Sequence, residues 1–375
     1  MGQNRHGLAL FFTLGVSLVD WERAGFLERE VNYYRQLAEH IGPVTFVTYG
    51  GAEDRAIADK LGGIRLLVNE HRLPPESFMR EAPMAYRDAL RGVAIVKSNQ
   101  IKGAWAALAA AALTGAHSIV RGGYLLSRFS ANRPTSLRVR FGLWRRELSL
   151  FHQADRVFLP SREDALYARR WYALPAEKVI ILPNFVDVDL FAPRDDLACE
   201  PGLIGFVGRL APQKNLSTLI EAAAGIPGVR LRLIGDGPER ERLKALAQQR
   251  GVTIDLLGTV PHHELPRLLA ECEIFVLPSL YEGAPKALLE AMSAALPVIA
   301  TKVQGSHALI RHRETGWLCE DTSAASLRRA LETLLHDSRL RTQMGRAARR
   351  FVVEHFSLPH VLQREVTAYR ELGCA

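Results

Sequence analysis

The second half of the chain alternates short apolar runs with helical stretches, and only short loops separate them. Residues 203–207, 231–234 and 274–277 each have the composition of a buried parallel strand, and each run is followed by a loop and then by a helical pattern. Strand, loop and helix repeated in this way are typical of a doubly wound α/β sheet. Open sheets of this kind bind ligands beyond the carboxyl ends of their strands. We therefore expect functional residues in the loops after these runs.

The loop after residues 274–277 carries two carboxylates at a suggestive spacing. Glu282 lies on the loop itself, and Pro285 occupies the expected start of a helix that contains Glu290. A helix start offers unpaired N–H groups and a partial positive charge to an anion, while carboxylates accept hydrogen bonds from hydroxyls. Together they fit a phosphorylated sugar or a nucleotide. The alternative is that a Glu pair at this spacing is coincidental and only compensates the helix dipole.

A second strand-to-helix loop, after residues 203–207, carries two cations. Arg209 and Lys214 bracket the turn that leads into the helix beginning near Leu216. Arg offers a planar fork of donors and Lys a compact charge, and both suit phosphate oxygens. The alternative is two solvated surface cations.

Several motifs occur in a fixed order and carry a family resemblance. They are Gly-Arg-Leu-x-Pro-x-Lys-Asn from Gly208, Gly-Asp-Gly-Pro from Gly235, Val-Pro-His-x-Glu-Leu from Val260, Pro-Ser-x-x-Glu-Gly-x-Pro-Lys-x-x-x-Glu-Ala-Met from Pro278, and Leu-Pro-Val-Ile-Ala-Thr from Leu296. From about Ala154 to Leu372 the chain resembles the retaining glycosyltransferases of the GT-B fold, family 4. The resemblance implies two Rossmann-like doubly wound α/β domains with the active site in the cleft between them.

The resemblance also implies a role for each matching position. Arg209 and Lys214 would hold the donor diphosphate and neutralise the charge that grows on it, and Glu282 would face the donor sugar. We therefore predict Arg209, Lys214 and Glu282 as catalytic. Glu290 would accept hydrogen bonds from the ribose hydroxyls. The full set of residues predicted to bind the donor is Glu290, Gly283, Ala284, Lys286, Thr259, Val260, Gly208 and Gly15.

The implied activity is transfer of a hexose from a nucleoside-diphosphate sugar to a glycan or lipid-linked acceptor, with retention at the anomeric carbon. The donor would be a UDP- or GDP-sugar, and no cofactor or metal would be required. Consistently, we find no His/Cys cluster at ligand spacing. The family suggests a place in the biosynthesis of surface polysaccharide or lipopolysaccharide. Two other functions stay open: a nucleotide-sugar epimerase of the same fold, and a non-catalytic nucleotide-sugar-binding subunit.

The N-terminal half matches the family less well. Many family members carry a Gly-Gly loop after the first strand, where this chain has single glycines at Gly15 and Gly25. Many also have a His after a middle strand, but the matching place, residues 120–124, has none. Arg121, with Lys97 and its neighbours, is the substitute candidate for the sugar and acceptor side. We predict an acceptor-side domain over residues 1–190, with the helix 356–375 packing back on it, and a donor domain over 191–355.

The positive charge is concentrated in the N-terminal half. The formal net charge is +8, and the run from Arg121 to Arg146 contains seven Arg and no acidic residue, with Phe129, Phe141 and Trp144 among them. Such a segment can rest on an anionic bilayer, or it can be a solvated Arg-rich helix and loop. Nucleic acid is a poorer partner, because no nucleic-acid-binding module accompanies the charge.

Two apolar stretches need comparison with membrane segments. Residues 8–19 resemble a short signal core but lack a small-residue cleavage site, and residues 104–120 are too broken for a span. We expect a buried strand in the first and, in the second, a buried helix followed by a strand. The four Cys residues are scattered and predict neither a disulfide framework nor a zinc site. We expect a cytoplasmic protein, with peripheral contact at the inner face of the cytoplasmic membrane as an option.

Overall fold

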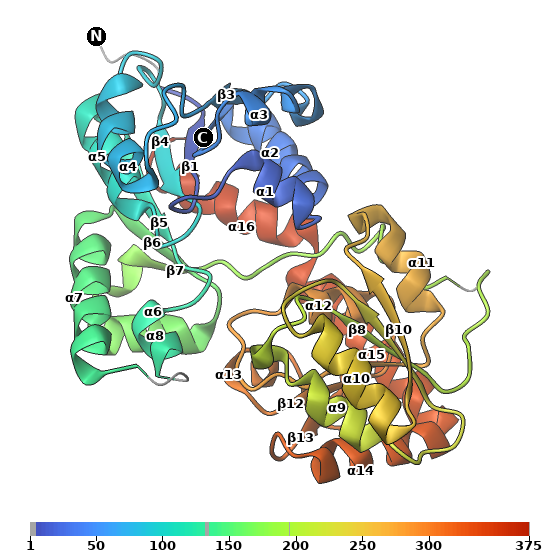
Figure 1. Cartoon of the computed structure of the whole chain (residues 1–375). Coiled ribbons are helices and arrows are strands. Elements are labelled where there is room, and N and C mark those ends of the chain that lie inside the picture. Colours follow the sequence, from blue (N-terminus) through green and yellow to red (C-terminus); the bar gives the residue numbers. More distant parts are fainter. Residues whose placement is uncertain (1–4, 132–134, 195, 375) are drawn as a thin grey trace. The chain divides into compact units, whose positions relative to one another are not determined.

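The computed structural model describes residues 5–131, 135–194 and 196–374. The chain forms two compact units (Figure 1). Unit 1 runs to Pro183 and resumes at Leu362, and unit 2 comprises Asn184–Val361. The C-terminal segment thus belongs to the same unit as the N-terminal half.

In the described part of unit 1, seven parallel strands form one sheet in the order β3-β2-β1-β4-β5-β6-β7. The order reverses between β1 and β4, so the loops after these two strands meet at a topological switch point. The strands are β1 (Leu8–Phe11), β2 (Val44–Val47), β3 (Arg65–Leu67), β4 (Ile95–Ser98), β5 (His117–Arg121), β6 (Arg156–Leu159) and β7 (Val179–Ile181).

Both faces of this sheet are covered. Ala9 and Phe11 of β1 pack in one apolar cluster with the Ala-rich helix α5 (Ala104–Thr114) and with Phe78 of α4 (Pro75–Ala85). On β2, Phe46 meets the ring of Tyr34 from α2 (Leu27–Ile41), with 5.3 Å between ring centroids. Burial on both faces explains why the strands are apolar throughout instead of alternating. The other helices are α1 (Leu18–Arg23), α3 (Ala52–Arg55), η1 (Ala58–Leu61), α6 (Leu126–Ser130), α7 (Leu137–Gln153), α8 (Arg162–Trp171) and η2 (Ala176–Lys178).

The last helix, α16 (Leu358–Arg370), enters unit 1 and is held there by a buried charge cluster. Glu365 accepts hydrogen bonds from Lys97 on β4, from Tyr33 on α2 and from Tyr369 one turn along α16. Lys97 and Glu365 are almost completely buried. Burial alone would raise the pKa of Glu365, but the ammonium of Lys97 and these hydrogen bonds hold it below its ordinary value.

Unit 2 has the same architecture. In its described residues, six parallel strands form a sheet in the order β10-β9-β8-β11-β12-β13, and the order reverses between β8 and β11. One continuous apolar core surrounds this sheet. The strands are β8 (Leu203–Val207), β9 (Arg230–Ile234), β10 (Thr253–Gly258), β11 (Ile274–Leu277), β12 (Val298–Thr301) and β13 (Trp317–Cys319).

The helices of unit 2 follow these strands, as the alternation in the sequence predicts. They are η3 (Pro212–Lys214), α9 (Leu216–Ala223), α10 (Arg240–Arg250), η4 (His262–Glu264), α11 (Leu265–Ala270), α12 (Lys286–Ser293), α13 (Gln304–His307), α14 (Ala324–His336) and α15 (Ser338–Phe356).

The two apolar stretches compared with membrane segments are internal to unit 1. Residues 8–11 form the central strand β1, and α5 and β5 occupy the second stretch, with most of the alanines of α5 buried. No helix in the described residues has both the length and the apolarity to cross a membrane.

Candidate functional site

The switch point of unit 2 brings together the two loops that the sequence singles out. The backbone N–H of Leu280, after β11, donates to the carbonyl of Gln213, after β8, at 2.8 Å. The side-chain amide of Gln213 returns a hydrogen bond to the carbonyl of Tyr281 at 2.8 Å. These reciprocal bonds fix the loop that carries Lys214 against the loop that carries Glu282.

Two glycines allow neighbouring segments to pack closely against these two loops. Gly235, after β9, has a φ of +131°, and a Cβ there would lie 2.1 Å from the carbonyl oxygen of Gly208. On α13, a Cβ on Gly305 would lie 2.5 Å from the carbonyl oxygen of Gly283. A side chain at either position would displace a loop of the site, because backbone cannot yield as a flexible side chain can.

Lys214 and Glu282 form an ion pair at the centre of this arrangement. The Lys214 Nζ lies 2.5 Å from the Glu282 Oε1, and the two side chains are 17% and 7% exposed. The buried Ser279 hydroxyl donates to the same oxygen at 2.6 Å. Thr301, at the end of β12, donates to the Ser279 carbonyl at 2.5 Å. Lys214 and Ser279 thus hold the carboxylate of Glu282 directly, and Thr301 at the end of the neighbouring strand fixes Ser279.

The two oxygens of Glu282 have different surroundings. Within the described residues, the structure shows two side-chain hydrogen bonds to this carboxylate, and Oε1 accepts both of them. The second oxygen, Oε2, is therefore the one left to accept a hydrogen bond from a ligand hydroxyl. A carboxylate held on one oxygen is already oriented before a ligand arrives, which reduces the entropic cost of binding.

Glu290 is held by a histidine that the sequence did not single out. The Nε2 of His262, in η4, lies 3.0 Å from the Glu290 Oε1, and both side chains are 5% exposed. The His262 ring in turn packs against Phe191, with 5.2 Å between ring centroids. His262 therefore fixes the orientation of the carboxylate at which ribose hydroxyls are expected.

The start of α12 presents backbone donors beside Glu282. Within the described residues, the N–H groups of Gly283 and Ala284 show no protein acceptor. The carbonyl of Ala284 accepts from the Asn184 side chain at 2.7 Å, which secures this segment. Lys286 lies in the first turn of the helix, and its ammonium is 5.4 Å from the centroid of the Phe185 ring. Unpaired N–H groups at a helix start suit an anion.

The other residues predicted in unit 2 lie at the carboxyl ends of neighbouring strands. Arg209 is exposed beside Gly208, whose N–H donates to the carbonyl of Ile234 at 2.9 Å. Thr259 is exposed and Val260 half-buried in the loop after β10. All the predicted site residues of unit 2 thus come from the loops after β8, β10 and β11 and from α12.

Gly15 belongs to unit 1 and lies in the turn after β1, at the switch point of that sheet. The helix start that follows it is already occupied. The buried carboxylate of Asp54 accepts from the N–H of Leu18 at 2.9 Å and from the N–H of Val19 at 3.0 Å. Ser17 caps the same helix and exchanges hydrogen bonds with Asp20. An internal carboxylate therefore takes the place where an anionic ligand could bind.

Arg121 and Lys97 were considered as substitutes for the family's His near the donor sugar. Lys97 has a structural role instead. Its ammonium is bound to Glu365 and only 1% of its surface is exposed, so it cannot contact a ligand without disrupting α16. Arg121 lies at the end of β5 and is half-buried.

The sequence reasoning missed Ser279, His262, Gly305 and Asn184. Ser279 and His262 stand inside the motifs that carry the resemblance, directly after Pro278 and Pro261. Their position in those motifs was the available signal. Nothing in the spacing alone shows that each binds one of the two Glu residues.

Comparison with known proteins identifies the family of this chain. Residues 193–351 match the family described as "Glycosyl transferases group 1", and residues 31–190 match "Glycosyltransferase Family 4". Over 268 residues the chain is 30% identical to the alpha-D-kanosaminyltransferase of Streptomyces kanamyceticus, covering 66% of this chain and 69% of that protein. The chain belongs to the glycosyl transferases group 1 family.

Two further similarities describe this glycosyltransferase more fully. The lipopolysaccharide core biosynthesis glycosyltransferase LpsE of Rhizobium meliloti is 28% identical over 224 residues, covering 58% of this chain and 65% of LpsE. The glycosyltransferase thus spans about two thirds of the length of these relatives. The crystal structure of Anabaena Alr3699/HepE in complex with UDP and glucose superposes with a TM-score of 0.80 at 17% identity, covering 98% of this chain and 100% of that one. The GT-B fold is therefore shared.

Proposed function

We propose that this glycosyltransferase moves a hexose from a UDP- or GDP-sugar to a glycan or lipid-linked acceptor with retention at the anomeric carbon. The observation that carries the proposal is the pairing of Lys214 with Glu282 at the switch point of unit 2, with the unpaired N–H groups of Gly283 and Ala284 beside it. The site offers a cation and backbone donors to a diphosphate, and carboxylates to hydroxyls. HepE, which was crystallised with UDP and glucose, has the same fold.

In the proposed reaction, the bond from the anomeric carbon to the diphosphate oxygen breaks and a bond to the acceptor oxygen forms on the same face. The proton of the acceptor hydroxyl passes to the departing diphosphate oxygen, so no protein nucleophile is required. Lys214 and Arg209 neutralise the charge that accumulates on the diphosphate, and such stabilisation is commonly the largest catalytic contribution. We propose that these cations make a metal unnecessary.

Replacement of Lys214 tests the proposal. If the Lys214 contact tightens in the transition state, Lys214→Ala should lower kcat by roughly 100-fold or more while the affinity for the free nucleoside diphosphate falls much less. Lys244→Ala, which removes an exposed lysine of α10, is the matched control. Equal losses in affinity and rate would show that Lys214 binds the ground state only.

The stereochemistry and the metal requirement need their own measurements. Proton NMR of the first product formed should show the anomeric configuration of the donor, and EDTA should leave the initial rate unchanged. An inverted anomer would contradict retention. Loss of activity in EDTA that Mg²⁺ restores would contradict the metal-free proposal.

Two other functions make different predictions in the same assay. An epimerase would consume the donor and change its sugar with no acceptor present. A non-catalytic subunit would bind the donor and never release a nucleoside diphosphate. The ion pair and the oriented Glu282 favour transfer. They place a cation that can bind the diphosphate beside a carboxylate that can accept hydrogen bonds from the sugar hydroxyls.

The relatives support a role in glycan assembly at the cell envelope. LpsE is named for lipopolysaccharide core biosynthesis. We therefore propose that the enzyme acts in the cytoplasm, at the inner face of the cytoplasmic membrane, on an acceptor of this type.

A further inference from the structure

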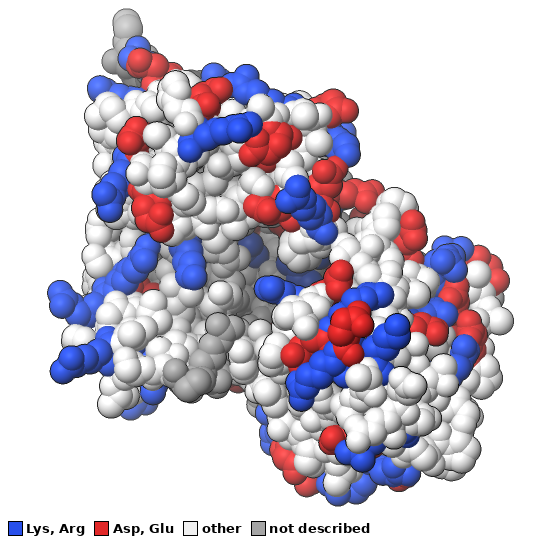
Figure 2. All heavy atoms as spheres, viewed as in Figure 1, with Lys and Arg blue, Asp and Glu red and all other residues white. Residues whose placement is uncertain are grey.

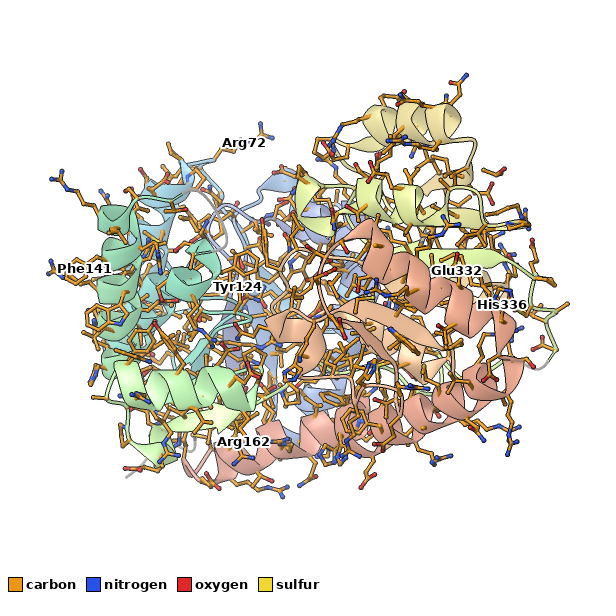
Figure 3. The ribbon with its side chains drawn as sticks, turned by 90° about the horizontal axis from the view of Figure 1, so that it is seen from below. Arg72, Tyr124, Phe141, Arg162, Glu332 and His336 are labelled. Carbon is orange, nitrogen blue, oxygen red and sulfur yellow. The ribbon has the colours of Figure 1, made fainter. Side chains whose placement is uncertain are left out.

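The first two turns of α7 expose large apolar side chains to solvent. Leu137 is 77% exposed, Val139 53% and Phe141 58%. Phe141 projects outward from α7 at the edge of unit 1 (Figure 3). A solvated helix that only carries charge has no reason to expose three such residues within five positions, and apolar surface of this kind marks an interaction site.

The rest of the helix is firmly docked, so this exposure is not a sign of a loosely held segment. Leu150 and Phe151 are in the apolar core of unit 1. Glu147 is fully buried and accepts hydrogen bonds from the N–H groups of Leu126 and Ser127 at the start of α6 and from the Tyr172 hydroxyl. The C-terminal half of α7 therefore anchors an N-terminal half whose apolar side chains face water.

Ring stacking holds Phe141 in its outward position. The Phe141 ring stacks on Trp144 with 5.8 Å between centroids and an interplanar angle of 16°. Trp144 in turn lies 6.0 Å from the ring of buried Tyr172. Leu137, Phe141 and Trp144 recur every three or four residues and so share one side of the helix. This apolar stripe extends the core of unit 1 outward.

The charge around the stripe has one sign. Arg138 and Arg145, seven residues apart, lie along the same flank of the helix next to the stripe, and Arg146 is exposed as well. Glu147 is the sole acidic residue of α7, and it is buried. In Figure 2, blue side chains separated by white surface project from the part of unit 1 that contains α7. Arg133, which the sequence analysis placed in the same run, lies outside the described residues.

We infer that the N-terminal half of α7 is a docking surface for an anionic lipid bilayer. Leu137, Phe141 and the edge of Trp144 enter the boundary between headgroups and acyl chains, while Arg138 and Arg145 pair with lipid phosphates. The apolar stripe decides between the two alternatives that the sequence left open, because a purely solvated Arg-rich helix would not require it. The inference does not depend on sugar transfer, since it is tested with no donor or acceptor.

Co-sedimentation of the full chain with vesicles tests it. The chain should bind vesicles of 30% phosphatidylglycerol in phosphatidylcholine and bind pure phosphatidylcholine far less. Arg138→Gln/Arg145→Gln should lower the partition coefficient about 25-fold, since each charge near an anionic surface contributes about fivefold. Leu137→Ser/Phe141→Ser should lower it about tenfold or more.

Met84→Ser/Arg87→Gln is the matched control, because it removes an exposed apolar residue and an exposed Arg at the end of α4. It should bind vesicles like the wild type. All these positions are exposed, so thermal melting should confirm that each variant is folded.

Three results would overturn the inference. One is a folded wild type that binds no vesicle, and another is equal binding to neutral and anionic vesicles. The third is size-exclusion chromatography with light scattering in which the wild type is a dimer and Leu137→Ser/Phe141→Ser is a monomer, with no vesicle binding by either. That result would assign the surface to a second copy of the chain.

Discussion

Ser279 orients Glu282 without itself needing to touch a ligand. Its hydroxyl and the Lys214 ammonium both bind Oε1, so the direction of Oε2 is set before the donor arrives. Hydrogen bonds to charged groups contribute about 1.5 to 3 kcal/mol, which corresponds to a tenfold effect or more. We therefore predict that the hydroxyl of Ser279 affects binding of the donor sugar and leaves binding of the nucleotide nearly unchanged.

Ser279→Ala should therefore raise the dissociation constant of the nucleotide sugar about tenfold or more and change that of the free nucleoside diphosphate little. Calorimetric titration of both ligands gives the comparison. Ser293→Ala is the matched control, since Ser293 is equally buried and donates instead to the carbonyl of Phe191. Equal weakening of both ligands would mean that Ser279 supports only the loop.

His262 should have the complementary effect on the ribose. It binds Glu290 at 3.0 Å, and its removal leaves a buried carboxylate without this partner. We predict that His262→Ala weakens nucleoside diphosphate binding about tenfold and removes the preference for ribose over 2′-deoxyribose.

Titration of UDP and 2′-deoxy-UDP checks this prediction. His263→Ala, at the exposed neighbour in the same turn, should keep the preference. If His262→Ala discriminates between the two nucleotides as the wild type does, Glu290 does not need His262 for its role.

At the scale of single elements, Glu365 attaches α16 to unit 1. A buried charge that loses its partner costs about 3 to 5 kcal/mol, whereas replacing both charges by apolar residues is often neutral. Glu365→Gln should therefore lower the free energy of unfolding by about 3 kcal/mol or more. Lys97→Met/Glu365→Leu should recover most of that loss in denaturant unfolding. Additive losses in the double variant would contradict a coupled pair.

The pH dependence of this attachment has a definite sign. The pKa of Glu365 is held below its ordinary value by Lys97 and its other donors, although burial opposes the shift. Its stabilising contribution is therefore complete above the carboxyl pKa of the unfolded chain, near 4.3, and is lost as the pH falls through the lower pKa of the folded state.

The stability difference between the wild type and Glu365→Gln should shrink as the pH falls below about 4. Urea unfolding of both proteins at several pH values measures this difference. A difference that stays constant down to acid pH would contradict the charged state of Glu365 in the folded protein.

The helices and strands also show which features of the fold and the site could be predicted from the sequence alone. Strand–loop–helix alternation was sufficient to predict the doubly wound sheets, because parallel strands buried on both faces are apolar throughout. It placed Lys214 and Glu282 in loops that follow strands, but it could not show that these loops are adjacent or that the two residues pair, since that depends on the strand order at the switch point. For Lys97 the structure differs from the expectation. Its place after an apolar run suggested a ligand contact, yet its partner lies 268 positions away on α16.

At the scale of the whole molecule, the two units are built alike but offer different helix starts. In unit 2 the N–H groups of Gly283 and Ala284, which lie after β11 and just before α12, show no acceptor within the described residues. In unit 1 Asp54 occupies the helix start after β1, the strand equivalent to β8. An internal carboxylate at that position would repel a phosphate. We therefore propose that the diphosphate binds to unit 2, where the cations Arg209 and Lys214 also lie.

The central claim is that unit 2 holds a nucleoside-diphosphate sugar through Lys214, Glu282 and Glu290. The most direct test is saturation-transfer NMR of the purified chain against UDP-, GDP- and ADP-sugars, repeated with Glu290→Ala. We expect selective binding of one nucleotide, with the ribose signals reduced most in the variant. A folded protein that binds none of these sugars, or a Glu290→Ala variant that binds as the wild type does, would contradict it.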